Sequence, residues 1–154
     1  MDFAAKIDHT TLLNTHGFST LLEADRMPGF STLRYDFHKE DHTQSVFTIA
    51  EFLVSLSDSR APTLVILDSM YVWNSGRDEH LIATAFASMT DAKIDRLEDG
   101  SMFVWNSLEA KKAATLYHLA MLFGWDAYIY PTGGDVSAFI SHDGFIELNT
   151  DGDP

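Results

Sequence analysis

Residues 101–131 constrain the fold of this chain most, because they read as strand, helix and strand with almost no linker. Residues 102–105 are a short apolar run. Asn106 and Glu109 then have the three-residue spacing of a helix capping box. Residues 110–123 carry apolar side chains at helical spacing, and Gly124 suits the position just beyond a helix end. Because residues 127–130 resume as a strand, the stretch predicts one helix flanked by two strands.

The same patterns predict further elements along the chain. Apolar runs indicate strands at residues 32–37, 63–67, 136–141 and 145–148, and helical spacing indicates helices at 44–56 and 78–89. Asp143-Gly144, between the last two runs, is a strong hairpin signal. Residues 1–31 are poorly defined, and the polar tail 149–154 is expected to fray.

This order of elements predicts one domain over residues 1–154, of the α/β or α+β class. We expect a mixed sheet of about five to six strands, three main helices and a C-terminal antiparallel meander. A short repeat adds a detail: SMYVWNS at 69–75 returns as SMFVWNS at 101–107. The repeat predicts two strand-to-helix corners, in which Trp73 and Trp105 either pack against the core or together form a site.

Composition narrows the classes of function. A chain of 154 residues with 45% hydrophobic and 12% aromatic residues fits a folded domain. Its net charge of −13 argues against direct binding of nucleic acid or an anionic membrane and favours a basic protein partner. There is no cysteine, no leader-like start and no apolar run long enough to span a bilayer. We therefore expect a cytoplasmic protein of bacterial or phage origin.

Motifs for cofactor or metal chemistry are weak. No glycine-rich nucleotide loop follows a predicted strand, and His38 with His42 lacks a third metal ligand placed by sequence. No cofactor, metal or catalytic residue is predicted. Asp68 and Ser69 follow a predicted buried strand, where ligand-binding residues gather in open α/β sheets. A small hydrolase-like enzyme with its site near Asp68, Ser69 and the Trp73 and Trp105 corners is therefore an alternative reading. Separately, His142 lies in the turn of the last hairpin, where Asp143 favours the turn for backbone reasons and a general-base role is the alternative.

The charge pattern of the C-terminal third gives the preferred candidate site. No Lys or Arg follows Lys112, whereas acids and aromatic residues alternate through the same region. Protein-binding surfaces use rings as anchors and complementary charge to steer association. The predicted partner-binding residues share this region and these two chemistries: Trp125, Asp126, Tyr128, Tyr130, Asp135, Asp143 and Glu147.

The sequence thus favours a small acidic binding protein over an enzyme. It would inhibit or neutralise a basic partner, as an immunity protein or nucleic-acid mimic does, by electrostatic and steric occlusion of a toxin, a nuclease or a nucleic-acid-binding machine. The alternatives are the enzyme near Asp68 and a structural or assembly subunit that forms a homo-oligomer, such as a homodimer.

Overall fold

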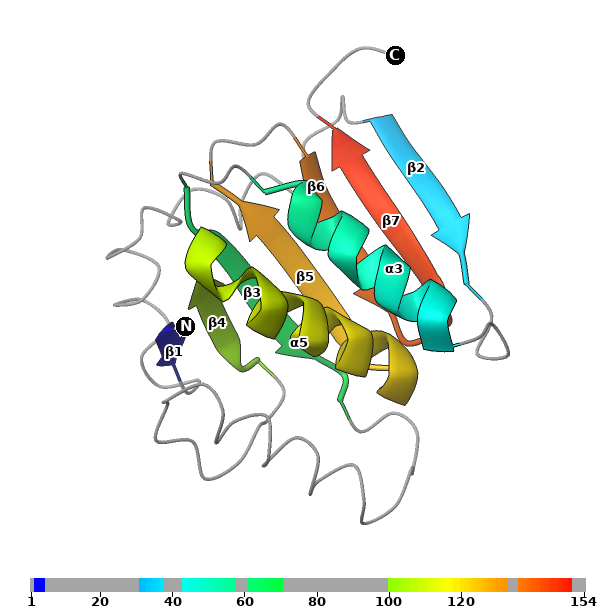
Figure 1. Cartoon of the computed structure of the whole chain (residues 1–154). Helices are drawn as coiled ribbons and strands as arrows, with labels where there is room; N and C mark the ends of the chain where they lie inside the picture. The colour runs from blue at the N-terminus through cyan, green and yellow to red at the C-terminus, as the bar shows by residue number, and fades with distance from the viewer. Residues whose placement is uncertain are drawn as a thin grey trace.

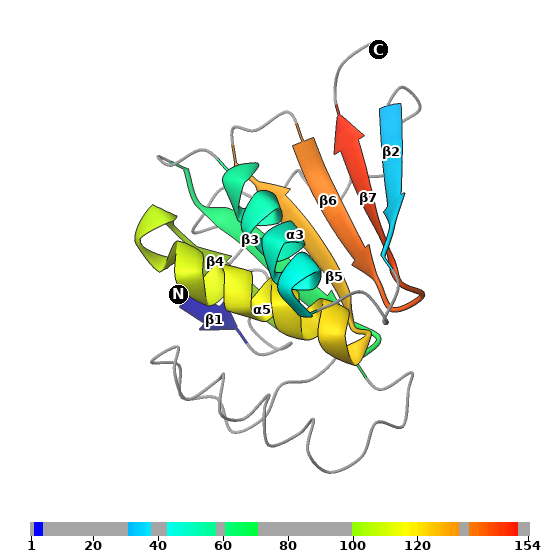
Figure 2. The same ribbon diagram turned by 45° about the vertical axis from the view of Figure 1, so that its right-hand side comes forward.

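A computed structural model describes residues 2–4, 31–37, 43–57, 61–70, 100–132 and 136–150. These residues form two layers, a sheet and a pair of helices packed side by side on one of its faces (Figures 1 and 2). The helices are α3 (Thr43–Ser55) and α5 (Ala110–Phe123), and a short 3₁₀ turn, η1 (Ser107–Glu109), precedes α5. The described strands are β1 (Asp2–Ala4), β2 (Ser31–Asp36), β3 (Thr63–Asp68), β4 (Met102–Trp105), β5 (Asp126–Pro131), β6 (Val136–Ser141) and β7 (Phe145–Thr150).

The seven described strands lie in the order β1-β4-β3-β5-β6-β7-β2, and every neighbouring pair is antiparallel. The expected mixed sheet is therefore wrong for this part of the chain, and the α+β class is the one that the structure supports. The β4–α5–β5 crossover does return parallel to β4, because both strands run antiparallel to β3. However, β3 lies between them, so the parallel strands never pair.

Element counts also differ from the expectation. Within the described residues the sheet has seven strands rather than five to six. The additional strand is β1, whose three residues are too few to give a periodic signal in the sequence. The described residues contain two helices longer than a single turn rather than three. The third expected helix, at 78–89, lies outside the described residues. The C-terminal meander of β5, β6 and β7 is confirmed.

The predicted capping box and the predicted end of α5 are both confirmed, and the box caps η1, which leads directly into α5. Asn106 Oδ1 accepts the N–H of Leu108 at 3.0 Å, and Glu109 Oε2 accepts the N–H of Asn106 at 3.4 Å, which completes the capping box. At the other end Gly124 adopts φ +66°, and the N–H of Trp125 reaches Ala120 O at 2.8 Å. A left-handed residue that ends a helix in this way is usually glycine, which has no Cβ to oppose it.

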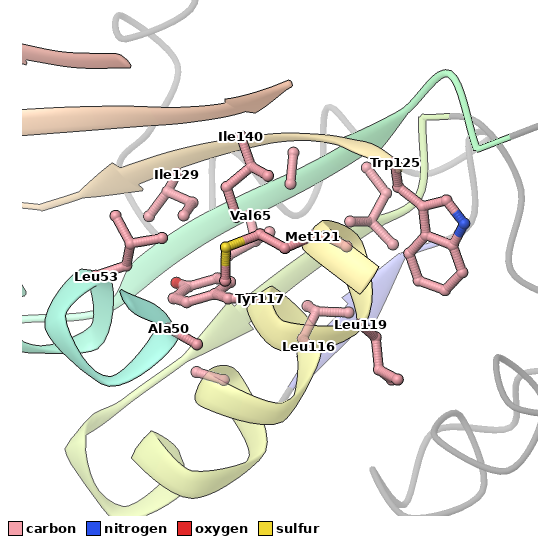
Figure 3. Close-up of a cluster of buried hydrophobic side chains, with 14 of the residues drawn as sticks. Ala50, Leu53, Val65, Leu116, Tyr117, Leu119, Met121, Trp125, Ile129 and Ile140 are labelled. Carbon is pink, nitrogen blue, oxygen red and sulfur yellow. The ribbon is translucent and has the colours of Figure 1, made fainter. Parts of the chain in front are cut away.

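Alternation along the central strands divides their apolar side chains between two faces of the sheet. The face beneath the helices carries the main core, in which sheet residues Val65, Ile129 and Ile140 face helix residues Leu53, Tyr117 and Met121 (Figure 3). The opposite face carries a smaller buried cluster formed by Leu64, Met102, Val104 and Tyr130. Because β3 is buried on both faces, its continuous apolar run is that of a central strand.

Candidate partner-binding surface

Two of the predicted partner-binding residues lie inside the protein. Trp125 follows Gly124 at the end of α5, is 0% exposed and stacks on Phe123 with ring centroids 5.6 Å apart. Tyr130 is buried in the smaller cluster on the opposite face of the sheet. In this conformation Trp125 offers no ring surface to a partner, and Tyr130 offers little.

Three of the other predicted residues lie at or near the surface. Tyr128 and Glu147 are half-buried and belong to the sheet face opposite the helices, whereas Asp143 is exposed in the β6–β7 turn. Asp126 is buried at the start of β5. Asp135 lies outside the described residues.

Strand register brings four aromatic rings into one row across the face opposite the helices. We call Tyr130, Tyr128, Phe139 and Phe145 the aromatic row; they come from β5, β6 and β7. Tyr128 stacks on Phe139 at 4.7 Å between centroids, and the Tyr128–Tyr130 and Phe139–Phe145 distances are 6.5 and 6.1 Å. Such offset and edge-on contacts are favourable ring geometries. The half-buried members, Tyr128, Phe139 and Phe145, leave part of their ring surface accessible.

A cation lies at the end of this row. The Arg34 guanidinium, from edge strand β2, lies 3.6 Å from the centroid of the Phe145 ring, and its Nε donates to Asp36 Oδ1 at 2.9 Å. Glu147 is in register with Phe139 on one neighbouring strand and with Arg34 on the other. Directly paired strand residues point to the same face. Ring, carboxylate and guanidinium therefore lie together on one surface.

Sequence reasoning did not select Arg34, Asp36, Phe139 or Phe145 as site residues. The alternation of residues 32–37 does place Arg34 and Asp36 on the same face of a strand. That this strand lies beside β7 depends on a pairing between segments far apart in sequence. No local pattern reveals such a pairing.

A second cluster occupies one end of the sheet. Asp126 Oδ1 accepts both the backbone N–H of His142 at 2.7 Å and its Nδ1–H at 2.8 Å, and His142 Nε2 lies 3.5 Å from Asp143 Oδ1. Asp68, the residue proposed for the enzyme alternative, is exposed and stands opposite Asp126 in the β3–β5 register. Ser69 beside it has φ +49°, unusual for a residue other than glycine. Within the described residues, no group of three His, Asp or Glu side chains is arranged to hold a metal ion.

The Trp-Asn-Ser corner can be judged in its second copy only. Trp105 is buried, and its Nε1–H donates to the hydroxyl of Tyr117 at 2.9 Å. It thus follows the core interpretation of the corner. Trp73 lies outside the described residues, so the paired-corner site stays a hypothesis.

Comparison of the chain with protein-family models, with curated proteins and with solved structures gives no match in any of the three. Neither α3 nor α5, the two helices of more than one turn in the described part of the chain, is long and apolar enough to cross a membrane. The case for a function therefore rests on the surfaces described above.

Proposed function

We propose that this protein is an acidic binding protein that inhibits a basic partner protein by covering its cationic surface. The docking surface would be the aromatic row together with the carboxylates beside it, Glu147, Asp36 and Asp143. The observation that carries the proposal is the position of the Arg34 side chain. The protein's own guanidinium rests on Phe145 at 3.6 Å and meets a carboxylate at 2.9 Å. A partner's arginine could make the same pair of contacts with the half-buried Phe139 and with Glu147, which lies beside it in the register.

The mechanism would divide between rings and charge. Arginine side chains of the partner stack on exposed ring faces better than lysines do, because the guanidinium is planar and more weakly hydrated than an ammonium. Net charge −13 and the absence of Lys and Arg after Lys112 attract a basic partner at long range. Such attraction acts mainly on the association rate and weakens with salt. A partner that binds nucleic acid would then meet acids where it expects phosphates.

The test uses two fluorescent peptides of equal length and charge, one rich in arginine and one rich in lysine. Fluorescence anisotropy of each, titrated with the protein at several salt concentrations, separates ring stacking from charge attraction. We expect the arginine peptide to bind more tightly, and Phe139→Ala to remove most of that preference. Glu147→Lys should weaken binding of both peptides by about tenfold, as for a pair of charges brought close.

Glu51→Lys is the matched control, because it makes the same change in net charge on the exposed surface of α3, on the helix side of the sheet. If Glu51→Lys weakens binding as much as Glu147→Lys does, the attraction is spread over the whole molecule and the docking surface is wrong. Equal affinity for the arginine and lysine peptides would exclude the role of the rings. If the peptides bind as expected, the binding of a basic partner protein identified later should depend on the same residues.

A second candidate function, a small hydrolase, is supported by the Asp126–His142 contact. A carboxylate that holds Nδ1 of a histidine fixes the tautomer in which Nε2 can accept a proton. Asp68 stands beside this pair in the sheet register. The test is turnover of a panel of chromogenic carboxylic and phosphate esters by the protein and by His142→Gln. Turnover that disappears in the variant would favour the enzyme, and no turnover by the unaltered protein would count against it.

A further inference from the structure

Strand β2 forms one edge of the sheet, and among the described residues it pairs with β7 alone. Its side chains at 32–36 are all exposed. On the helix side these include two large apolar residues, Leu33 at 66% and Tyr35 at 56% exposure. Natural sheets usually shorten, charge or cover a free edge, because its unpaired N–H and C=O groups can recruit another strand. A six-residue edge strand that carries exposed Leu and Tyr is therefore a candidate for pairing with a strand of another chain.

The apolar surface continues from this edge onto α3. A groove of about 250 Å³ separates β2 and β7 from the helix, and Phe52 at its rim is 48% exposed. The lining is apolar apart from one threonine: Leu33, Tyr35, Thr48, Ile49, Phe52, Leu53, Ile146 and Leu148. Exposed apolar residues that lie together, unlike single ones, mark interaction surfaces.

We propose that β2 pairs antiparallel with β2 of a second copy. The two copies would be related by a two-fold axis that is perpendicular to the sheet and passes between their Tyr35 residues. The backbone sets which residues can bond across such an edge. The Phe37 N–H points inward to Gly144 O at 2.8 Å. By alternation, the N–H and C=O groups of residues 34 and 36 point outward. These are the groups that the second copy's strand would meet.

Charge selects the register. With the axis at Tyr35, Arg34 of each copy faces the second copy's Asp36, and opposite charges across strands are favourable. Shifting the axis by one residue would place Arg34 against the second copy's Arg34, which is unfavourable. The edge is therefore complementary to itself in one register, the property that a two-fold interface requires.

The symmetry also accounts for the apolar groove. A two-fold axis perpendicular to the sheet keeps the helices of both copies on the same side. Tyr35 of each copy would then lie opposite its counterpart, and each Leu33 opposite the second copy's Phe37, so that apolar side chains of the two edges leave water together. The aromatic row lies on the opposite face, so the dimer would present two copies of it side by side. This inference does not rest on the proposed function, although the two share Arg34 and Asp36, which the dimer would pair across the two copies.

The test is a charge-swap mixing experiment followed by sedimentation velocity over a wide range of protein concentration. We expect the unaltered protein to dimerise and Arg34→Asp and Asp36→Arg each to dimerise about tenfold or more weakly, because two cross-strand pairs become repulsive. An equimolar mixture of the two variants should recover the dimer, since the aspartate introduced in one variant then faces the arginine introduced in the other. Within each single chain the 34–36 pair stays repulsive, so only contact between chains gives this recovery.

Lys111→Asp provides the matched control, because it makes the same charge change as Arg34→Asp at an exposed position of α5, away from β2. It should leave the dimer unchanged. Circular dichroism checks that each variant is folded before mixing. A monomer at every concentration of the unaltered protein would overturn the proposal, and so would a dimer insensitive to both variants or a mixture that fails to recover.

Discussion

Asp126 holds His142 by two hydrogen bonds to the same carboxylate oxygen, from the backbone N–H at 2.7 Å and from Nδ1–H at 2.8 Å. The contact fastens the β6–β7 turn to the first residue of β5. Asp143, the neighbour in sequence, is exposed and has its backbone N–H on Ser141 Oγ at 3.1 Å. The buried acid therefore has a structural task that the exposed one lacks, whatever else this end of the sheet does.

Replacement of Asp126 tests that task. Asp126→Ala leaves the His142 N–H and ring without their acceptor, so the free energy of unfolding should fall by about 1–3 kcal/mol. Asp126→Asn keeps an acceptor oxygen and should lose less. Asp143→Ala, as the exposed control, should change stability by no more than about 0.5 kcal/mol. Urea unfolding followed by fluorescence measures all three, and equal losses for Asp126→Ala and Asp143→Ala would contradict this account.

Tyr117→Phe should destabilise the core although it keeps the ring. The phenol is fully buried and accepts the Trp105 Nε1–H at 2.9 Å, so its removal leaves a buried donor without a partner. A loss of about 1–3 kcal/mol is expected. Leu108→Ala is a useful comparison, since Leu108 is 95% exposed and its truncation should cost little. A Tyr117→Phe variant as stable as the unaltered protein would show that the Trp105 N–H finds another acceptor.

Tyr117 should also limit stability at alkaline pH. Burial raises the pKa of this phenol well above its ordinary value of 10.0. The unfolded chain releases the proton near that ordinary value and the folded chain does not, so stability falls as pH rises above about 10. Melting temperatures of the unaltered protein and of Tyr117→Phe, compared at rising pH, should show a shallower alkaline decline in the variant. Parallel declines would assign the effect to other groups.

His118 should act at the acid side. Burial lowers its pKa below the ordinary 6.5, its ring meets Phe47 edge-on at 5.6 Å, and Glu51 and Lys111 line the adjoining groove. Within the described residues its Nδ1 has no hydrogen-bond partner. The unfolded chain binds this proton more readily than the folded chain does. The contribution of His118 to the free energy of unfolding is therefore fully present above about pH 6.5 and is lost as the pH drops below that value. His118→Gln should flatten that acid decline in thermal melts, and an unchanged slope would count against the assignment.

The capping box of η1, which leads directly into α5, offers a fourth site for mutation. Asn106→Ala removes the acceptor of the Leu108 N–H and should cost about 1 kcal/mol. Asn106→Asp keeps an acceptor and places a negative charge at the helix start, so it should retain most of the stability. Chemical denaturation of the pair measures both. A variant Asn106→Ala without loss would mean that water replaces the cap at no cost.

The elements that the sequence predicted well are those with local causes. Asn106, Glu109 and Gly124 determine where α5 begins and ends through contacts within a few residues, and the turn at Asp143-Gly144 is equally local. The order of strands depends instead on pairings such as Arg34 with Glu147, which no neighbouring residue encodes. The same limit explains Trp125. Interleaved acids and rings suggested an exposed anchor, but its place just after α5 directs the indole into the core.

The register of β2 with β7 has a consequence for the order of assembly. Ser31 pairs with Thr150, and Asp36 with Phe145, so β2 acquires its neighbour only after the last strand has been synthesised. Until then β2 stays unpaired while about a hundred residues of chain are synthesised. Pairing between strands so far apart in sequence slows folding. We therefore expect the edge strand that carries Leu33 and Tyr35 to stay exposed longest in the nascent chain, at the stage when exposed apolar surface most needs protection in the cell.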